Sequence, residues 1–279
     1  MPELPEVETV KRIIEPQILG HKIFGVDVCN RQVIAYPTPD KFVEILLGRV
    51  FVSMSRRGKF LSFHFDNGDE LVLHLRMTGQ LLVTPEDYPQ EKHTHVRIYL
   101  EDDRQIRYID VRRFGRFWYL TKEEADTMTG RSKLGPEPFD AALTAEYLQT
   151  KLGAKKKAIK EMLHDQSVVA GIGNIYSDEI LFASHIYPET RCCELTDADW
   201  QMLSEKIPEI LEWGIQTNAM SPEEYLAGKG KEYRNTPDLR VYGREGKPCV
   251  NCSTSLRRIT VGGRSSCFCP VCQKKVFKD

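Results

Sequence analysis

The residues at the start of the sequence, Pro2, Glu3 and Glu6, could together perform covalent chemistry on a sugar carbon. A small residue after Met1 favours removal of that methionine, which would leave Pro2 with a free secondary amine. An α-amino group has a pKa of about 7.7 to 8.0, so part of it is neutral near pH 7. Such an amine forms an iminium with an aldehyde-like carbon, and the two glutamates could transfer protons. The alternative is that these residues only begin a helix.

A second chemical cluster lies near the C-terminal end of the sequence. Cys249 and Cys252 form one CxxC pair, Cys269 and Cys272 form another, and sixteen residues separate the pairs. This spacing is typical of a site for one structural zinc ion, because four thiolates leave no open coordination position. Disulfides are the alternative in an oxidising compartment, and redox chemistry is the alternative for a single CxxC pair. Cys267 is interpreted as a bystander thiol.

The elements that position these groups begin with an N-terminal antiparallel β-sandwich and a flanking helix. Apolar residues recur at helical spacing over 7–18. Strand signals follow at 21–28, 50–54, 60–65, 71–75, 96–100, 105–109 and 117–120. We therefore predict a β-sandwich catalytic domain over residues 1–130.

Helical patterns follow the GPEP sequence at 135–138. They cover 141–151, 155–164, 176–184 and 196–215, and Pro208 is expected to kink or split the last helix. Residues 256–261 and 264–268 predict a β-hairpin between the cysteine pairs. The sequence thus predicts an α+β multi-domain protein, with a linker and first helix at 131–150, a helical domain at 151–235 and a zinc-finger hairpin at 236–279.

The composition is that of an ordinary globular protein, with 39 Lys and Arg against 40 Asp and Glu among 279 residues. No run of about 18 uncharged apolar residues is present, and the first residues lack a secretion signal. We therefore expect a cytoplasmic protein without a membrane segment. Residues 240–279 contain nine Lys or Arg against two acidic residues, although the formal net charge of the chain is −1. This basic end favours a polyanion as partner.

Several motifs, taken together, resemble those of the formamidopyrimidine-DNA glycosylase family. They are collinear over nearly the whole chain: MPELPEVET at 1–9, RGKF at 57–60, HLRM at 74–77, DVRRFG at 110–115, LGPEP at 134–138, DQ at 165–166, VAGIGNIY at 169–176, VYGR at 241–244 and the CxxC pairs. The resemblance implies a β-sandwich, a helix-two-turn-helix domain and a zinc finger that clamp damaged double-stranded DNA in a cleft. It also implies a monomeric bacterial enzyme of the cytoplasm, associated with the nucleoid when it acts.

The activity that the resemblance implies is base-excision repair by a DNA glycosylase and abasic-site lyase. Such an enzyme flips out oxidised purines (8-oxoguanine and formamidopyrimidines), removes them through a Schiff base on Pro2, and cleaves the strand by β,δ-elimination. Glu3 would be the acid and base, Glu6 would support the site, and Lys59 would hold phosphate beside the lesion. The expected further contacts to DNA are Asn174 and Arg264, together with His74, His93, Lys155 and Tyr242, whose alternative is an ordinary core or surface role.

A flipped nucleotide leaves a gap that the protein must fill. By resemblance, Phe114 is the wedge that kinks the stack, Met77 fills the gap and Arg112 reaches toward the orphaned base. Wedges of this kind unstack a base step at a cost of a few kcal/mol, which the contacts to bent DNA offset. The alternative for Met77 and Phe114 is packing in the core.

The sequence departs from the family pattern at 218–235, where many members have a Gly-Gly-Ser-Thr run and a loop that closes over the flipped base. Lys229, Lys231 and Arg234 in this segment could approach phosphates, and Pro222 stiffens its entry. His164 is a smaller departure, since an apolar residue is usual there. The altered segment leaves a non-catalytic or altered-specificity damaged-DNA-binding homologue as one alternative. An endonuclease VIII-like glycosylase for oxidised pyrimidines is another, which the Pro-Glu-Leu-Pro-Glu start disfavours.

Overall fold

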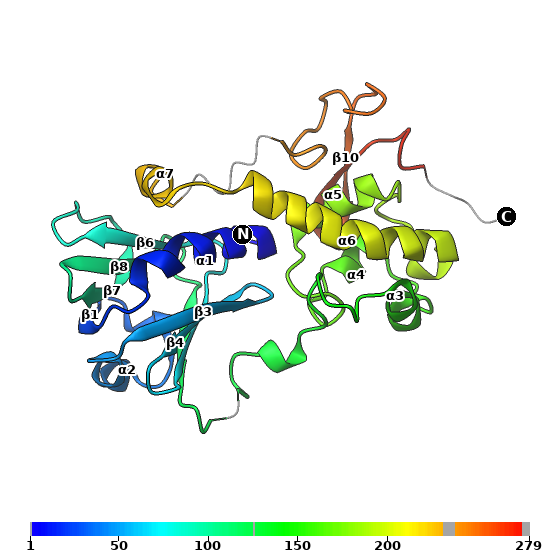
Figure 1. Ribbon diagram of the computed structural model, residues 1–279. Helices are drawn as coiled ribbons and strands as arrows, with labels where there is room; N and C mark the ends of the chain where they lie inside the picture. Colours follow the sequence, from blue (N-terminus) through cyan, green and yellow to red (C-terminus); the bar gives the residue numbers. More distant parts are fainter. Residues whose placement is uncertain (1, 125, 231–237, 275–279) are drawn as a thin grey trace. The chain divides into compact units, whose positions relative to one another are not determined.

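A computed structural model of the chain describes residues 2–124, 126–230 and 238–274 (Figure 1). The chain forms two compact units. The first contains Met1–Ser132 and Asn218–Asn235, and the second contains Lys133–Thr217 and Thr236–Asp279. The predicted boundary at 235 and 236 lies outside the described residues, and the other predicted boundaries stay predictions. Within the described part of the chain, no helix has the length and apolar character needed to cross a membrane.

The first unit is built on two β-sheets. The four-stranded sheet has the order β1 (Ile23–Val28), β7 (Thr94–Leu100), β8 (Arg104–Asp110) and β6 (Gly79–Pro85). The five-stranded sheet has the order β2 (Ile34–Tyr36), β9 (Arg116–Leu120), β5 (Glu70–His74), β4 (Phe60–Phe65) and β3 (Phe51–Arg57). All neighbouring strands are antiparallel except β2 and β9, which run parallel.

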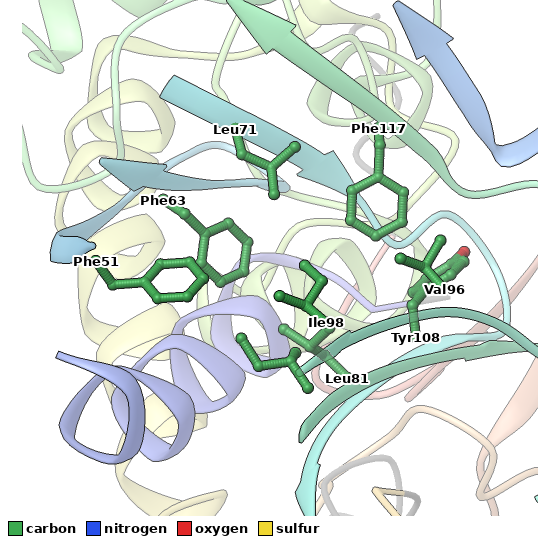
Figure 2. Close-up of a pocket in the computed structure, with 9 residues that line it drawn as sticks. Phe51, Phe63, Leu71, Leu81, Val96, Ile98, Tyr108 and Phe117 are labelled. Carbon is green, nitrogen blue, oxygen red and sulfur yellow. The ribbon is translucent and has the colours of Figure 1, made fainter. Parts of the chain in front are cut away.

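The inner faces of the two sheets supply the core of the sandwich. Figure 2 shows side chains of one sheet pointing toward those of the other: Phe51, Phe63, Leu71 and Phe117 face Leu81, Val96, Ile98 and Tyr108. The ring of Tyr108 meets that of Phe117 edge to face, with centroids 5.0 Å apart. Burial of this apolar area is the main contribution to the stability of the unit.

Two helices lie along the open edges of the sandwich. α1 (Leu4–Ile18) contacts the edge strands β3 and β6, one from each sheet, and α2 (Pro39–Leu46) contacts the opposite edge strands β1 and β2. A short helix, α7 (Pro222–Ala227), packs on α1 and β6. A 3₁₀ turn, η1 (Arg31–Val33), precedes β2, and another, η2 (Arg131–Lys133), ends the β-rich part of the chain. The helices thus cover strand edges that would otherwise be open to pairing.

The second unit consists of helices and one hairpin. Its elements are α3 (Ala145–Leu152), α4 (Ile159–Leu163), α5 (Asn174–Ala183), η3 (Cys192–Glu194), α6 (Asp197–Thr217), β10 (Arg257–Val261) and β11 (Arg264–Phe268). α5 contacts both α6 and β11 (Figure 1). α6 continues through Pro208 as one element, so of the predicted kink or split the split does not occur. Buried residues on both sides of the proline, Leu203 and Leu211 among them, belong to one core cluster that holds the helix together.

The sequence patterns predicted the α+β class and most of the α-helices and strands, but not four of these and none of the 3₁₀ turns. β2, β6, α2 and α7 were not predicted. α7 lies within the 218–235 segment, and its beginning is marked by a capping box in which Ser221 Oγ accepts from the N–H of Glu224. The Ser-Pro-Glu-Glu sequence at 221–224 carries this signal.

Candidate functional site

The start of α1 gathers three buried polar side chains of the first unit. The N–H of Glu3 donates to Glu6 Oε2 over 2.8 Å, and Asn218 Nδ2 donates to Glu6 Oε1 over 3.4 Å. Glu3 and Glu6 are each 2% exposed and Asn218 is 3% exposed. Pro2 is buried beside them, and its nitrogen remains an amide for as long as Met1 precedes it. Glu6 therefore fixes the backbone next to Pro2, and the site gains Asn218, to which sequence reasoning gave no role.

Lys59 and His74 lie close together on the first unit. Lys59 is 6% exposed in the tight turn between β3 and β4, and His74 is the last residue of β5. Burial and the positive charges of Arg76 and Lys59 lower the pKa of His74 to about 3. The N–H of Arg76 donates to His74 Nδ1 over 2.9 Å, which places the ring proton on Nε2. His74 is thus a neutral donor, and its ring packs edge to face on Phe60.

Met77, Arg112 and Phe114 come together from two separate turns of the first unit. Met77 follows β5, whereas Arg112 and Phe114 follow β8. Arg112 Nη1 lies 3.0 Å from Met77 Sδ, and its guanidinium carbon lies 4.7 Å from the centre of the Phe114 ring. Met77 is 38% exposed and Phe114 is 46% exposed, so neither is packed in the core. The structure therefore brings the three predicted wedge residues into one exposed cluster.

A buried carboxylate, Asp110, holds the two turns together. Its Oδ2 accepts from the N–H of Gly115 and from the Tyr108 hydroxyl, both over 2.9 Å. Its Oδ1 accepts from the N–H of Arg112 over 3.1 Å and from the Thr78 hydroxyl. Burial would raise the pKa of Asp110, but these four donors outweigh it and hold the pKa below its usual range. Sequence reasoning included Asp110 in a motif and gave it no function.

His93 lines a surface hollow of about 250 Å³ beside these turns. The lining residues are Thr78, Gln80, Glu91, Lys92, His93, Ile109, Val111 and Lys229. Lys229, which we expected near phosphates, instead pairs with Glu91 over 2.9 Å. Lys231 and Arg234, for which the same was expected, lie outside the described residues.

Asn174 lies at the first position of α5 in the second unit, after Gly171 and Gly173. Gln166 braces this loop, because its Nε2 donates to the carbonyl of Ile172 over 2.7 Å and its Oε1 accepts from the N–H of Gly171 over 2.9 Å. Among the described residues, the side-chain oxygen of Asn174 has no hydrogen-bond partner although it is buried. The first N–H groups of a helix point outward and favour an anion, so this helix start suits a phosphate.

The other predicted contacts of the second unit lie on separate elements. Lys155 is exposed between α3 and α4, Arg264 is exposed at the start of β11, and Tyr242 is half-buried in a turn. His164 ends α4, and its Nε2 lies 3.4 Å from Ser177 Oγ on the first turn of α5.

The four predicted cysteines converge in the second unit. The sulfur atoms of Cys249, Cys252, Cys269 and Cys272 all lie within 4.8 Å of one another. Cys252 Sγ lies 3.4 Å from Cys269 Sγ, and Cys249 Sγ lies 3.9 Å from Cys272 Sγ. Tetrahedral zinc with Zn–S bonds of about 2.3 Å places its ligands about 3.8 Å apart, so the four thiolates fit one structural zinc ion. Cys267 is not part of this group, as predicted.

Three family models match successive parts of the chain. They are the formamidopyrimidine-DNA glycosylase N-terminal domain over residues 1–117, the H2TH domain of the same family over 134–224, and the zinc finger found in FPG and IleRS over 246–275. The formamidopyrimidine-DNA glycosylase of Desulforamulus reducens is 42% identical over 275 residues, covering 98% of this chain and 99% of its own. That of Moorella thermoacetica is 44% identical over 259 residues, covering 93% and 94%.

Solved structures match over the same length. Lactococcus lactis Fpg in complex with DNA that contains an abasic site is 36% identical, has a TM-score of 0.89, and is matched over 98% of this chain and 100% of that one. The complex of the same enzyme with DNA that contains FAPY-dG gives a TM-score of 0.88 at the same identity and coverage.

Proposed function

This chain belongs to the formamidopyrimidine-DNA glycosylase family, and we propose on that basis that it excises oxidised purines from double-stranded DNA and cuts the strand at the resulting abasic site. The observation that carries the proposal is the exposed contact of Met77, Arg112 and Phe114. Three side chains from two turns form a cluster that is not packed in the core, as a wedge for an opened base stack requires. Each unit carries groups suited to DNA, and we propose that the protein acts as a monomer in the cytoplasm.

The proposed chemistry begins with the secondary amine of Pro2 after removal of Met1. Its nitrogen forms a bond to C1′ while the bond from C1′ to the damaged base breaks, and the base leaves with the electron pair and takes a proton from Glu3. Opening of the sugar ring, in which O4′ takes up a proton, gives an iminium that acts as the electron sink. The C2′ proton is then lost together with the 3′ phosphate, and the C4′ proton together with the 5′ phosphate. Glu6, held by Asn218 and the N–H of Glu3, keeps the amine beside Glu3.

The proposed grip on DNA uses backbone phosphate, which carries no sequence information. Lys59 supplies a positive charge and His74 supplies a neutral Nε2–H donor in the first unit. Asn174 and Arg264 hold flanking phosphates in the second unit, and Tyr242, Lys155 and His93 are proposed at the margins of the same surfaces.

Borohydride trapping with a duplex that contains 8-oxoguanine or formamidopyrimidine tests the mechanism. Wild-type protein should form a covalent adduct, and Pro2→Gly should form at least about tenfold less. Pro5→Ala is the matched control, because it removes a proline from the same helix start but leaves the terminal amine. An undiminished adduct with Pro2→Gly would contradict the role of Pro2.

The preferred lesion is proposed to be a ring-opened or oxidised purine. The segment at 218–235 differs from the family pattern, and α7 lies within it, so the panel of duplexes should include an oxidised pyrimidine. Release of base from the purine lesions at least about tenfold faster than from the pyrimidine lesion supports the proposal. Binding to all of them without release would favour a non-catalytic damaged-DNA-binding protein.

A further inference from the structure

Glu179 occupies a site made of three consecutive backbone N–H groups in the second unit. Its Oε1 accepts from Val241 and Tyr242, both over 2.9 Å, and its Oε2 accepts from Arg240 over 3.0 Å. Its side chain is 0% exposed. One carboxylate on α5 thus fixes the backbone of the turn that carries Tyr242, although about sixty residues separate the two in sequence.

The preceding residue, Asp178, holds the zinc hairpin to the same helix. Its Oδ1 accepts from Lys160 Nζ over 2.5 Å and from Ser266 Oγ over 2.6 Å. Its Oδ2 accepts from the N–H of Cys267 over 3.0 Å, and Lys160 Nζ also donates to the carbonyl of Ser265 over 2.9 Å. Lys160 and Asp178 are each 1% exposed.

The turn at the tip of the hairpin lies close against α4. Gly262 has a φ of +55°, and a Cβ atom at this position would lie 2.5 Å from Glu161 Cγ. The hairpin therefore meets α4 at its tip and α5 along β11, on both sides of Arg264 in sequence.

The contacts of Asp178 and Glu179 converge on the helix that begins with Asn174. We propose that Asp178 and Glu179 are positioning residues that hold Tyr242 and Arg264 in register with Asn174, so that the three contact successive phosphates of one DNA backbone. This inference rests on the function proposed above. Neither acid touches DNA, and each acts through the backbone of the element that it holds.

The hydrogen bonds of the two acids argue for a positioning role over a role of their negative charge alone. A negative charge in a DNA-binding unit repels the phosphate backbone, so its removal alone should strengthen binding. Glu179 accepts from three N–H groups, and Asp178 accepts from a lysine and two further donors. Hydrogen bonds of this kind fix the position and orientation of the bonded backbone, which apolar packing does not. The same substitution should thus weaken DNA binding if the acid is a positioning residue, and strengthen it if the acid acts only through its charge.

The test is the Glu179→Gln variant, measured for binding to a duplex that contains a tetrahydrofuran abasic-site analogue. An amide has one acceptor oxygen, so it cannot satisfy three N–H groups. The dissociation constant should rise at least about tenfold, and KM should rise far more than kcat falls. Only contacts of Lys or Arg with phosphate release counterions, so the slope of log K against log salt should decrease by about 1 when Arg264 no longer holds its phosphate. A role confined to folding would not change this slope.

Controls separate positioning from charge and from folding. Glu189→Gln removes an equal charge from an exposed side chain of the same unit and should not weaken binding. Zinc content and amide exchange at residues 240–242 show whether Glu179→Gln is folded and whether the turn alone is loosened. If that variant does not fold, the double variant Lys160→Met with Asp178→Asn, which leaves no unpaired charge, should weaken binding in the same way.

Two results would overturn different claims. Equal or tighter binding by a folded Glu179→Gln protein, with an unchanged salt slope, overturns the positioning role and leaves the proposed function intact. Wild-type protein that neither binds nor cuts lesion duplex overturns the proposed function and this inference with it.

Discussion

The two units hold their exposed candidate DNA contacts by different physical means. In the first unit, the turns that carry Met77, Arg112 and Phe114 meet at one carboxylate, Asp110, whose four donors are all neutral. In the second unit, the hairpin that carries Arg264 is held by four cysteines and by the buried ion pair of Lys160 and Asp178. The turns around Asp110 are thus held without a metal ion and without a positively charged partner for the carboxylate.

The electrostatics of the two carboxylates differ accordingly. Neutral donors outweigh burial at Asp110 and hold its pKa below the usual range. At Asp178, burial raises the pKa against the opposing effects of Lys160, Ser266 and the N–H of Cys267. A buried ion pair becomes costly when one partner is lost, because the other charge is then left unpaired. The turns that carry Met77 and Phe114 should therefore tolerate chelation of zinc, whereas the hairpin should depend on zinc.

Removal of zinc should have the largest effect and should be confined to the second unit. A chelator leaves four thiols that repel one another when ionised, so the hairpin loses the geometry that places Arg264. Affinity for abasic-analogue duplex should fall at least about 100-fold, and amide exchange in β4 and β5 should not change. Added zinc should restore binding. Equal binding by the metal-free protein would show that the ion pair alone holds the hairpin, and the two units would then not differ in their need for a metal.

Asp110→Asn should have the next largest effect and should be confined to the first unit. The amide oxygen replaces one carboxylate oxygen, but the amide nitrogen faces N–H and O–H donors, so the two turns separate. We expect a loss of about 2 kcal/mol in the free energy of unfolding. Single-turnover base release should slow about tenfold, and the fluorescence of 2-aminopurine beside the lesion should report less unstacking.

The control for this variant is Asp69→Asn. Asp69 immediately precedes β5, at the end of that strand away from the turn of Met77. Asp69 accepts from the Tyr119 hydroxyl over 2.7 Å and from the N–H of Lys122 over 3.1 Å, so it also is a carboxylate held by neutral donors. This change should reduce stability without affecting unstacking. If both variants slow base release equally, the effect of Asp110 is one of general stability.

The sequence predicted the groups that carry chemistry better than the groups that hold them. The cysteine spacing identified the metal site, because two CxxC pairs constrain the geometry locally. The motifs around Met77 and Phe114 predict a wedge only through family resemblance, since an isolated methionine or phenylalanine indicates a core residue. β4 was predicted from its strand signals at its observed bounds, Phe60–Phe65.

The supporting residues could not be predicted because their partners are distant in sequence. Glu179 lies in a helix, where a glutamate usually faces solvent, and nothing nearby indicates the turn at 240–242. Asn218 reaches Glu6 across most of the chain. β6 is buried over nearly its whole length, so it lacks the alternation of apolar and polar residues that marks a half-exposed strand.

At neutral pH the smallest expected effect is that of replacing His74, the neutral side chain that supports the turn leading to Met77. Its folded pKa of about 3 lies below the usual value of about 6.5, so the unfolded chain binds a proton more readily than the folded chain. The stability gained from neutral His74 is therefore complete above pH 6.5 and is lost as the pH falls toward 3. In His74→Gln, the dependence of the free energy of unfolding on pH between 6.5 and 4 should become flatter by up to about 1.4 kcal/mol per pH unit. Urea unfolding at several pH values measures this slope. The same slope in variant and wild type would mean that His74 is protonated in the folded protein over this pH range. The first unit would then also contain a buried charged group, as the second unit does with Lys160 and Asp178.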